Sequence, residues 1–140
     1  MADVNPPTDV TQVIAASALR AQEARMRIIA ENLANADSTA KDPSGDPYRR
    51  QVPIFETMTV QAGAKGVHVT RISPDKTPFR NEYQPGNPAA DAKGYVKMPN
   101  VDPLIESLDM REAQRAYEAN LSVVETARAI QASTIDLLKK

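Results

Sequence analysis

Residues 84–103 read QPGNPAADAKGYVKMPNVDP, and they close a segment in which the helix-breaking residues of this chain are gathered. All five glycines and nine of the eleven prolines lie between Pro43 and Pro103. In a helix interior glycine is less favourable than alanine by about 1 kcal/mol and proline by about 3 kcal/mol, so this segment cannot be one helix. The flanking stretches, 8–42 and 104–140, contain neither residue. The sequence therefore predicts a long helix at each end.

Composition limits the kinds of partner that the chain can have. Its 140 residues fit one domain, its apolar content includes two Phe and no Trp, and its net charge is -1. Mixed charge of this kind argues against nucleic-acid binding and against docking on anionic lipid. No apolar run approaches the roughly 18 residues that cross a bilayer, and residues 1–10 lack the pattern of a cleaved signal peptide. We expect no direct membrane insertion, and the absence of cysteine removes disulfide chemistry.

The first helix is predicted to begin near Asp9, which has the spacing of a capping box with Gln12. Apolar residues then recur at steps of three and four, which is close to the 3.5-residue period of a coiled-coil seam. The seam positions are Ala15, Leu19, Met26, Ile29, Leu33 and Ala36, with Gln22 in a vacant slot.

The second helix has a sharper start, because Asp102 can cap it and Pro103 suits its first position. Its apolar stripe comprises Met110, Ala113, Tyr117, Val124, Ala127 and Leu138, and it is broadened by Ala116, Val123, Ile130, Ile135 and Leu137. This face is wider than one partner helix needs. The pattern therefore fits two interpretations, a self-contained hairpin of helices and a subunit of a polymer.

These patterns predict a mainly α fold, in which the long N- and C-terminal helices pair as an antiparallel coiled coil around a small β-rich or irregular insertion. We expect a flexible segment at 1–8, a helical core of 9–40 and 102–140, and a Pro/Gly-rich insertion at 41–101. Within the insertion, residues 48–60, 66–72 and 79–83 favour short strands. Residues 84–95 favour an ordered loop packed on a helix.

No catalytic, metal or cofactor site is expected. The single histidine, His68, has no second His or Cys with which to complete a transition-metal site. Residues 42–46 lack the ligand spacing of a calcium loop, and no glycine-rich phosphate loop follows a strand. The chain is predicted not to be an enzyme. A monomeric helical adaptor and, less favoured, a peptidoglycan-acting enzyme with two close carboxylates are the alternatives.

Two stretches resemble a known family. Residues 30–39, AENLANADST, resemble the A-x-N-x-A-N signature of the axial proteins of the flagellar rod and hook. Residues 83–103, followed by RAYEAN at 115–120, are similar to the proximal rod proteins of the bacterial flagellar basal body. The chain departs from the family pattern at Glu31, at Asn87 and over 105–108.

The resemblance implies a structural subunit that polymerises through its terminal helices into a hollow, torque-transmitting rod. Implied partners are further copies of the chain, other rod proteins, the adaptor at the rod base, the distal rod and the flagellar export apparatus. The implied location is the rod where it spans the periplasm, reached by export without a cleaved signal. No cofactor is implied.

The same resemblance and the apolar seams together give candidates for contacts between subunits. The candidates are Leu19, Met26, Asn32, Ala34 and Asn35 in the first helix, Tyr95 and Asn100 in the loop, and Arg115, Tyr117, Glu118, Asn120, Val124 and Ala127 in the second helix. Asn35 also has the position of a helix cap. Capping and hydrogen bonding between subunits both remain open for it.

Overall fold

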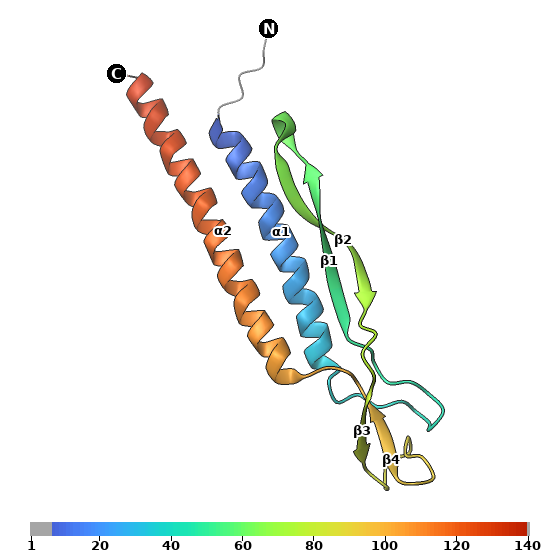
Figure 1. The fold of residues 1–140 in the computed structure, drawn as a ribbon. Coiled ribbons are helices and arrows are strands. Elements are labelled where there is room, and N and C mark those ends of the chain that lie inside the picture. Colours follow the sequence, from blue (N-terminus) through green and yellow to red (C-terminus); the bar gives the residue numbers. More distant parts are fainter. Residues whose placement is uncertain (1–6, 140) are drawn as a thin grey trace. The chain divides into compact units, whose positions relative to one another are not determined.

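A computed structural model describes residues 7–139 of the chain, with side chains from Val10 onward, as two helices and two small sheets (Figure 1). In chain order the elements are α1 (Pro7–Ala34), β1 (Gln51–Thr59), the short 3-10 helix η1 (Gln61–Gly63), β2 (Lys65–Pro74), β3 (Arg80–Tyr83), β4 (Tyr95–Met98) and α2 (Pro103–Leu138). Strand β1 pairs with β2, and β3 pairs with β4. The side chain of Asp9, which was predicted to cap the first helix, is not among the described side chains. Residues 1–6 of the predicted flexible segment 1–8 also lie outside the described residues.

The predicted start of the second helix is confirmed. Helix α2 begins at Pro103, and the Asp102 carboxylate accepts hydrogen bonds from the backbone N–H groups of Leu104, at 2.9 Å, and Ile105, at 3.4 Å. These bonds satisfy donors that have no partner within the helix. The strands expected at 48–60, 66–72 and 79–83 are present as β1, β2 and β3. The expected loop at 84–95 ends in β4, which the sequence did not predict.

The chain divides into two compact units. Unit 1 contains α1 up to Arg25, the hairpin residues Ile54–Arg71, and α2 from Glu112 onward. Unit 2 contains Met26–Pro53 and Ile72–Arg111, so it holds the end of α1, the start of α2 and the β3–β4 sheet.

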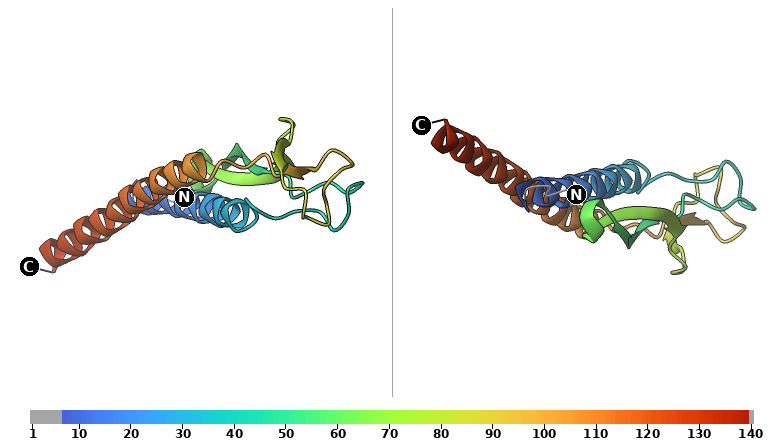
Figure 2. Two further views of the ribbon diagram at one scale, coloured as in Figure 1. Left: turned by 90° about the horizontal axis from the view of Figure 1, so that it is seen from below. Right: turned by 90° about the horizontal axis from the view of Figure 1, so that it is seen from above.

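In unit 1, helix α1 has α2 on one side and the β1–β2 hairpin on the other (Figures 1 and 2). Gln12 donates to Gln131 across the two helices at 3.3 Å, and Arg25 lies 3.6 Å from Glu112, so the helices run antiparallel. On the hairpin side, the Val67 N–H donates to the Ser17 hydroxyl at 3.1 Å.

The hairpin approaches α1 closely at Gly66. A Cβ atom at this position would lie 2.7 Å from the Ser17 Oγ and 2.9 Å from a methyl group of Val60. Glycine therefore lets the β2 backbone lie directly against the helix.

The predicted antiparallel coiled coil is wrong, because α1 is buried on two sides. The neighbouring residues Ile28 and Ile29 are both buried, as are Ser17 and Ala21. Residues 17, 21 and 28 share the side of the helix that meets β2, whereas Ile29 lies with Ala15 on another side. A coiled-coil strand buries one narrow seam, but here the predicted seam covers only part of the buried surface. The fold is instead two helices with two two-stranded sheets, and the hairpin is a layer against α1.

In unit 2, the β3–β4 sheet has one buried and one exposed side. The strands are antiparallel, with Tyr83 opposite Tyr95 and Arg80 opposite Met98. Val96 and Met98 are buried in a small apolar cluster with Ala89. Side chains alternate along a strand, so Tyr95 faces the other way and remains exposed.

Within the described residues, no helix is both long and apolar enough to cross a membrane.

Candidate assembly interface

A buried asparagine joins three segments of unit 2. Asn32, near the end of α1, donates to the Gln51 carbonyl at 2.9 Å and to the Glu106 carboxylate at 3.0 Å. Its side-chain oxygen accepts from the Tyr48 hydroxyl at 2.8 Å and from the Gln51 N–H at 2.9 Å. Asparagine has two donor hydrogens and one oxygen with two lone pairs, so its hydrogen-bonding capacity is filled within the chain. Asn32 thereby fixes the end of α1 to the start of β1 and to the first turn of α2.

Glu106 is the second member of this buried group, and its side chain is fully buried. Its carboxylate forms an ion pair with the Arg50 Nε and accepts from Asn32. Arg50 also lies 3.4 Å from Asp75 and 3.5 Å from Asp109. A carboxylate can be buried when it is paired and hydrogen-bonded, as Glu106 is.

The environment of this group changes the ionisation of two neighbours. Burial disfavours the charge on Arg50, but hydrogen bonds and charge interactions with Glu106 and Asp75 outweigh burial and raise the pKa of the guanidinium. Burial, followed by the charges of Glu31 and Glu106, raises the pKa of the Tyr48 hydroxyl. Both shifts favour the protonated forms, which are the hydrogen-bond donors in this group.

Asn100 is a second polar bridge in unit 2. Its side-chain oxygen accepts from the Arg50 N–H at 2.8 Å. Its amide donates to the Thr77 hydroxyl at 2.8 Å and to the Asp75 carbonyl at 3.2 Å. Asn100 thus holds the segment after β2 against the residue that precedes β1.

The other first-helix candidates differ in exposure. Leu19 and Met26 are half-buried, and Ala34 is exposed. The Asn35 amide donates to the Glu31 carbonyl at 2.8 Å, so this side chain does cap the helix end. Whether these residues also contact another subunit stays a prediction.

Tyr95 stands at the end of an ordered loop that depends on Gly94. Gly94 has a φ of 83°, and a Cβ atom there would lie 2.8 Å from the Tyr83 ring. The Tyr83 and Tyr95 rings meet edge to face, with centroids 5.4 Å apart. Asp91 accepts from the Tyr95 N–H at 2.9 Å, and this bond, ahead of one from Lys93, lowers the pKa of Asp91.

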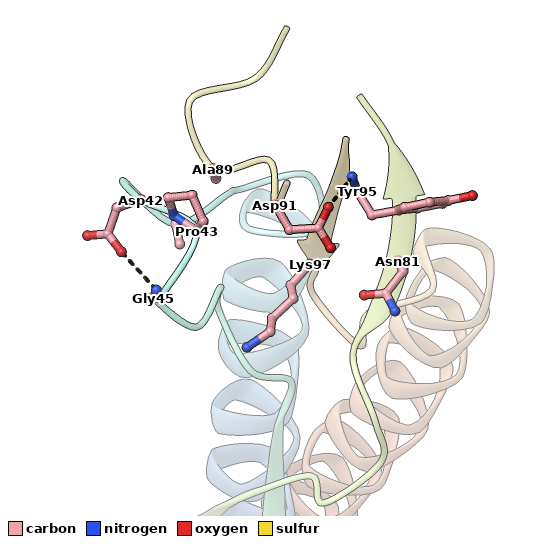
Figure 3. A pocket seen from close by; sticks show the side chains of 9 residues that line it. Asp42, Pro43, Gly45, Asn81, Ala89, Asp91, Tyr95 and Lys97 are labelled. Atoms are coloured by element: carbon pink, nitrogen blue, oxygen red, sulfur yellow. Dashed lines mark hydrogen bonds between the residues drawn. The ribbon is translucent and has the colours of Figure 1, made fainter. Parts of the chain in front are cut away.

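A small cavity of about 180 Å³ lies beside this loop (Figure 3). Its lining residues are Ala40, Asp42, Pro43, Gly45, Asn81, Ala89, Asp91, Tyr95 and Lys97. The Asp42 carboxylate in its wall accepts from the Gly45 N–H at 2.9 Å, so this acid stabilises a turn. Among the described side chains, which begin at Val10, no group of three or more His, Asp or Glu could hold a metal ion.

The second-helix candidates lie at different depths. Val124 and Ala127 are buried, Tyr117 and Asn120 are half-buried, and Arg115 and Glu118 are exposed. The Asn120 amide donates to the Ala116 carbonyl at 2.7 Å. The structure of one chain therefore leaves Arg115 and Glu118 available to a partner and uses Val124 and Ala127 internally.

Large apolar side chains remain exposed along α2. They are Leu104, Ile105, Leu108, Leu121, Val123, Ile130, Ile135, Leu137 and Leu138. Buried residues of α2 form only a narrow stripe, comprising Glu106, Ala113, Val124 and Ala127. Of the eleven residues of the apolar face predicted from the sequence, five are thus exposed in the single chain, namely Val123, Ile130, Ile135, Leu137 and Leu138.

Sequence reasoning missed Arg50, Glu106 and Tyr48. Glu106 lies in the first turn of α2, where the helix dipole favours an acidic residue. Its presence there therefore does not indicate that it is buried or paired. Arg50 and Tyr48 lie in an irregular segment with no pattern that marks a buried residue. The partners of Glu106, Arg50 and Tyr48 in this group lie 16 to 74 residues away in sequence.

Comparison with known proteins gives similarity over nearly the whole chain. A family model described as "Flagella basal body rod protein" matches residues 14–40, and one described as "Flagellar basal body rod FlgEFG protein C-terminal" matches residues 92–137. These ranges include residues 30–39, and they include residues 92–103 and 115–120 of the second stretch, but not residues 83–91.

Individual relatives agree with the family models. The flagellar basal-body rod protein FlgC of Agrobacterium fabrum is 50% identical over 134 residues, which cover 95% of this chain and 96% of the relative. The protein of the same name from Escherichia coli O6:H1 is 44% identical, with 89% and 92% covered. That of Borreliella burgdorferi is 36% identical, with 90% and 94% covered.

Proposed function

Because this chain belongs to the family of flagellar basal-body rod proteins, it is a structural subunit of the basal-body rod, and we propose that its helices polymerise into a hollow shaft that transmits torque. The observation that carries this proposal is the number of large apolar side chains that α2 leaves exposed. Large exposed apolar patches mark interaction sites in soluble proteins. Neighbouring subunits would cover these side chains.

The contacts within each unit suit a part that carries mechanical load. Helix α1 is packed on two sides in unit 1, and the Asn32–Glu106–Arg50 group ties three segments together in unit 2. Densely packed interiors have low compressibility and transmit strain. A subunit of this kind passes force from one neighbour to the next with little internal yielding.

The partners follow from the same assignment. The chain assembles with other flagellar rod components. More specifically, it contacts other copies of itself, further rod proteins, the adaptor at the rod base and the distal rod. It reaches the periplasmic part of the rod through the flagellar export apparatus, without a cleaved signal. The division into a core of 9–40 and 102–140 and an insertion of 41–101 outside the tube is part of this proposal.

The relatives are named as rod proteins, and the proposed role of this chain is structural without catalysis. The interface candidates named from the sequence belong to the same proposal. Tyr117, half-buried on α2, is the most direct of them to test.

The first test is mass spectrometry of detergent-purified basal bodies from cells that express the chain. A constant ratio of the chain to rod and ring proteins is expected, and its absence from intact basal bodies would refute the assignment.

A variant then tests the helix contact. Tyr117→Asp places a charge in a half-buried seam and is expected to abolish swimming while the chain is still made. Gln114→Asp, at an exposed position of the same helix, is the matched control and should swim normally. Normal swimming by the Tyr117 variant would remove this residue from the interface.

A further inference from the structure

We draw no further inference here: the strongest candidate, the groove that Ala21, Met58 and Val67 line between α1 and the β1–β2 hairpin, carries none, because nothing in the structure shows what covers it.

Discussion

Glu106→Ala tests whether the buried polar group holds unit 2 together. The substitution removes the ion pair with Arg50 and one of the acceptors of Asn32. A hydrogen bond to a charged group contributes about 1.5–3 kcal/mol and a neutral one about 1 kcal/mol. Breaking a buried pair destabilises by about 3–5 kcal/mol when the remaining charge has no other partner. Arg50 keeps Asp75 and Asp109 within 3.5 Å, so we expect the lower end of that range, about 3 kcal/mol.

Urea unfolding followed by circular dichroism at the helical band measures this change. A loss of about 3 kcal/mol corresponds to a midpoint lowered by about 1 to 2 M urea for a chain of this size. Glu118→Ala, on the exposed surface of the same helix, should change the free energy of unfolding by less than about 0.5 kcal/mol. If the two variants were equally stable, Glu106 would not be an organising residue of unit 2.

Three further predictions concern turns and close contacts. Gly94→Ala should destabilise the folded chain by about 1–2 kcal/mol, because alanine is strained at a positive φ. The same variant should weaken the near-ultraviolet circular dichroism of the tyrosines. Gly86→Ala is the control and should do neither, because nothing lies within 4 Å of the added methyl group. Gly66→Ala should separate β2 from α1, and an unchanged rate of hydrogen exchange at the Val67 amide would contradict this. The pKa values of three carboxyl groups are lowered below 3.8, chiefly by hydrogen bonds from Ser44 to Asp42, from Thr77 to Asp75 and from Tyr95 to Asp91. The stability that these hydrogen bonds give to the folded chain is therefore complete above pH 3.8. It is lost as the pH falls through the lowered pKa values. Amide chemical shifts of Thr77 and Tyr95 that stay constant during acid titration by NMR would show that reasoning to be wrong.

The sequence was informative where local rules decide the structure. The distribution of glycine and proline located both helices, and the Asp102–Pro103 pair located the start of α2 within one residue. Runs of Val, Ile and Thr located the hairpin strands. The packing of the hairpin on α1 was not predicted, because the residues that receive it, Ser17 and Ala21, are small and carry little hydrophobic signal.

The polar group of unit 2 could not be predicted for a different reason. Asn32 was singled out through the family motif as a contact between subunits, whereas the structure gives it four hydrogen bonds within its own chain. Those partners lie 16, 19 and 74 residues away in sequence. A single sequence contains no periodic pattern that pairs residues over such separations. The breadth of the apolar face on α2 could be predicted from the sequence, because it depends only on the spacing of apolar residues along a helix.

The position of Glu106 in the chain also sets the order of folding. Asn32 belongs to the first quarter of the sequence, yet its last partner is made only when residue 106 of 140 has been reached. Contacts between residues so far apart form slowly, because the intervening chain must first be brought together. Because synthesis of the chain runs from its N-terminus, Asn32 lacks its Glu106 partner until residue 106 has been made. Unit 2 can therefore be completed only after most of the chain has been made.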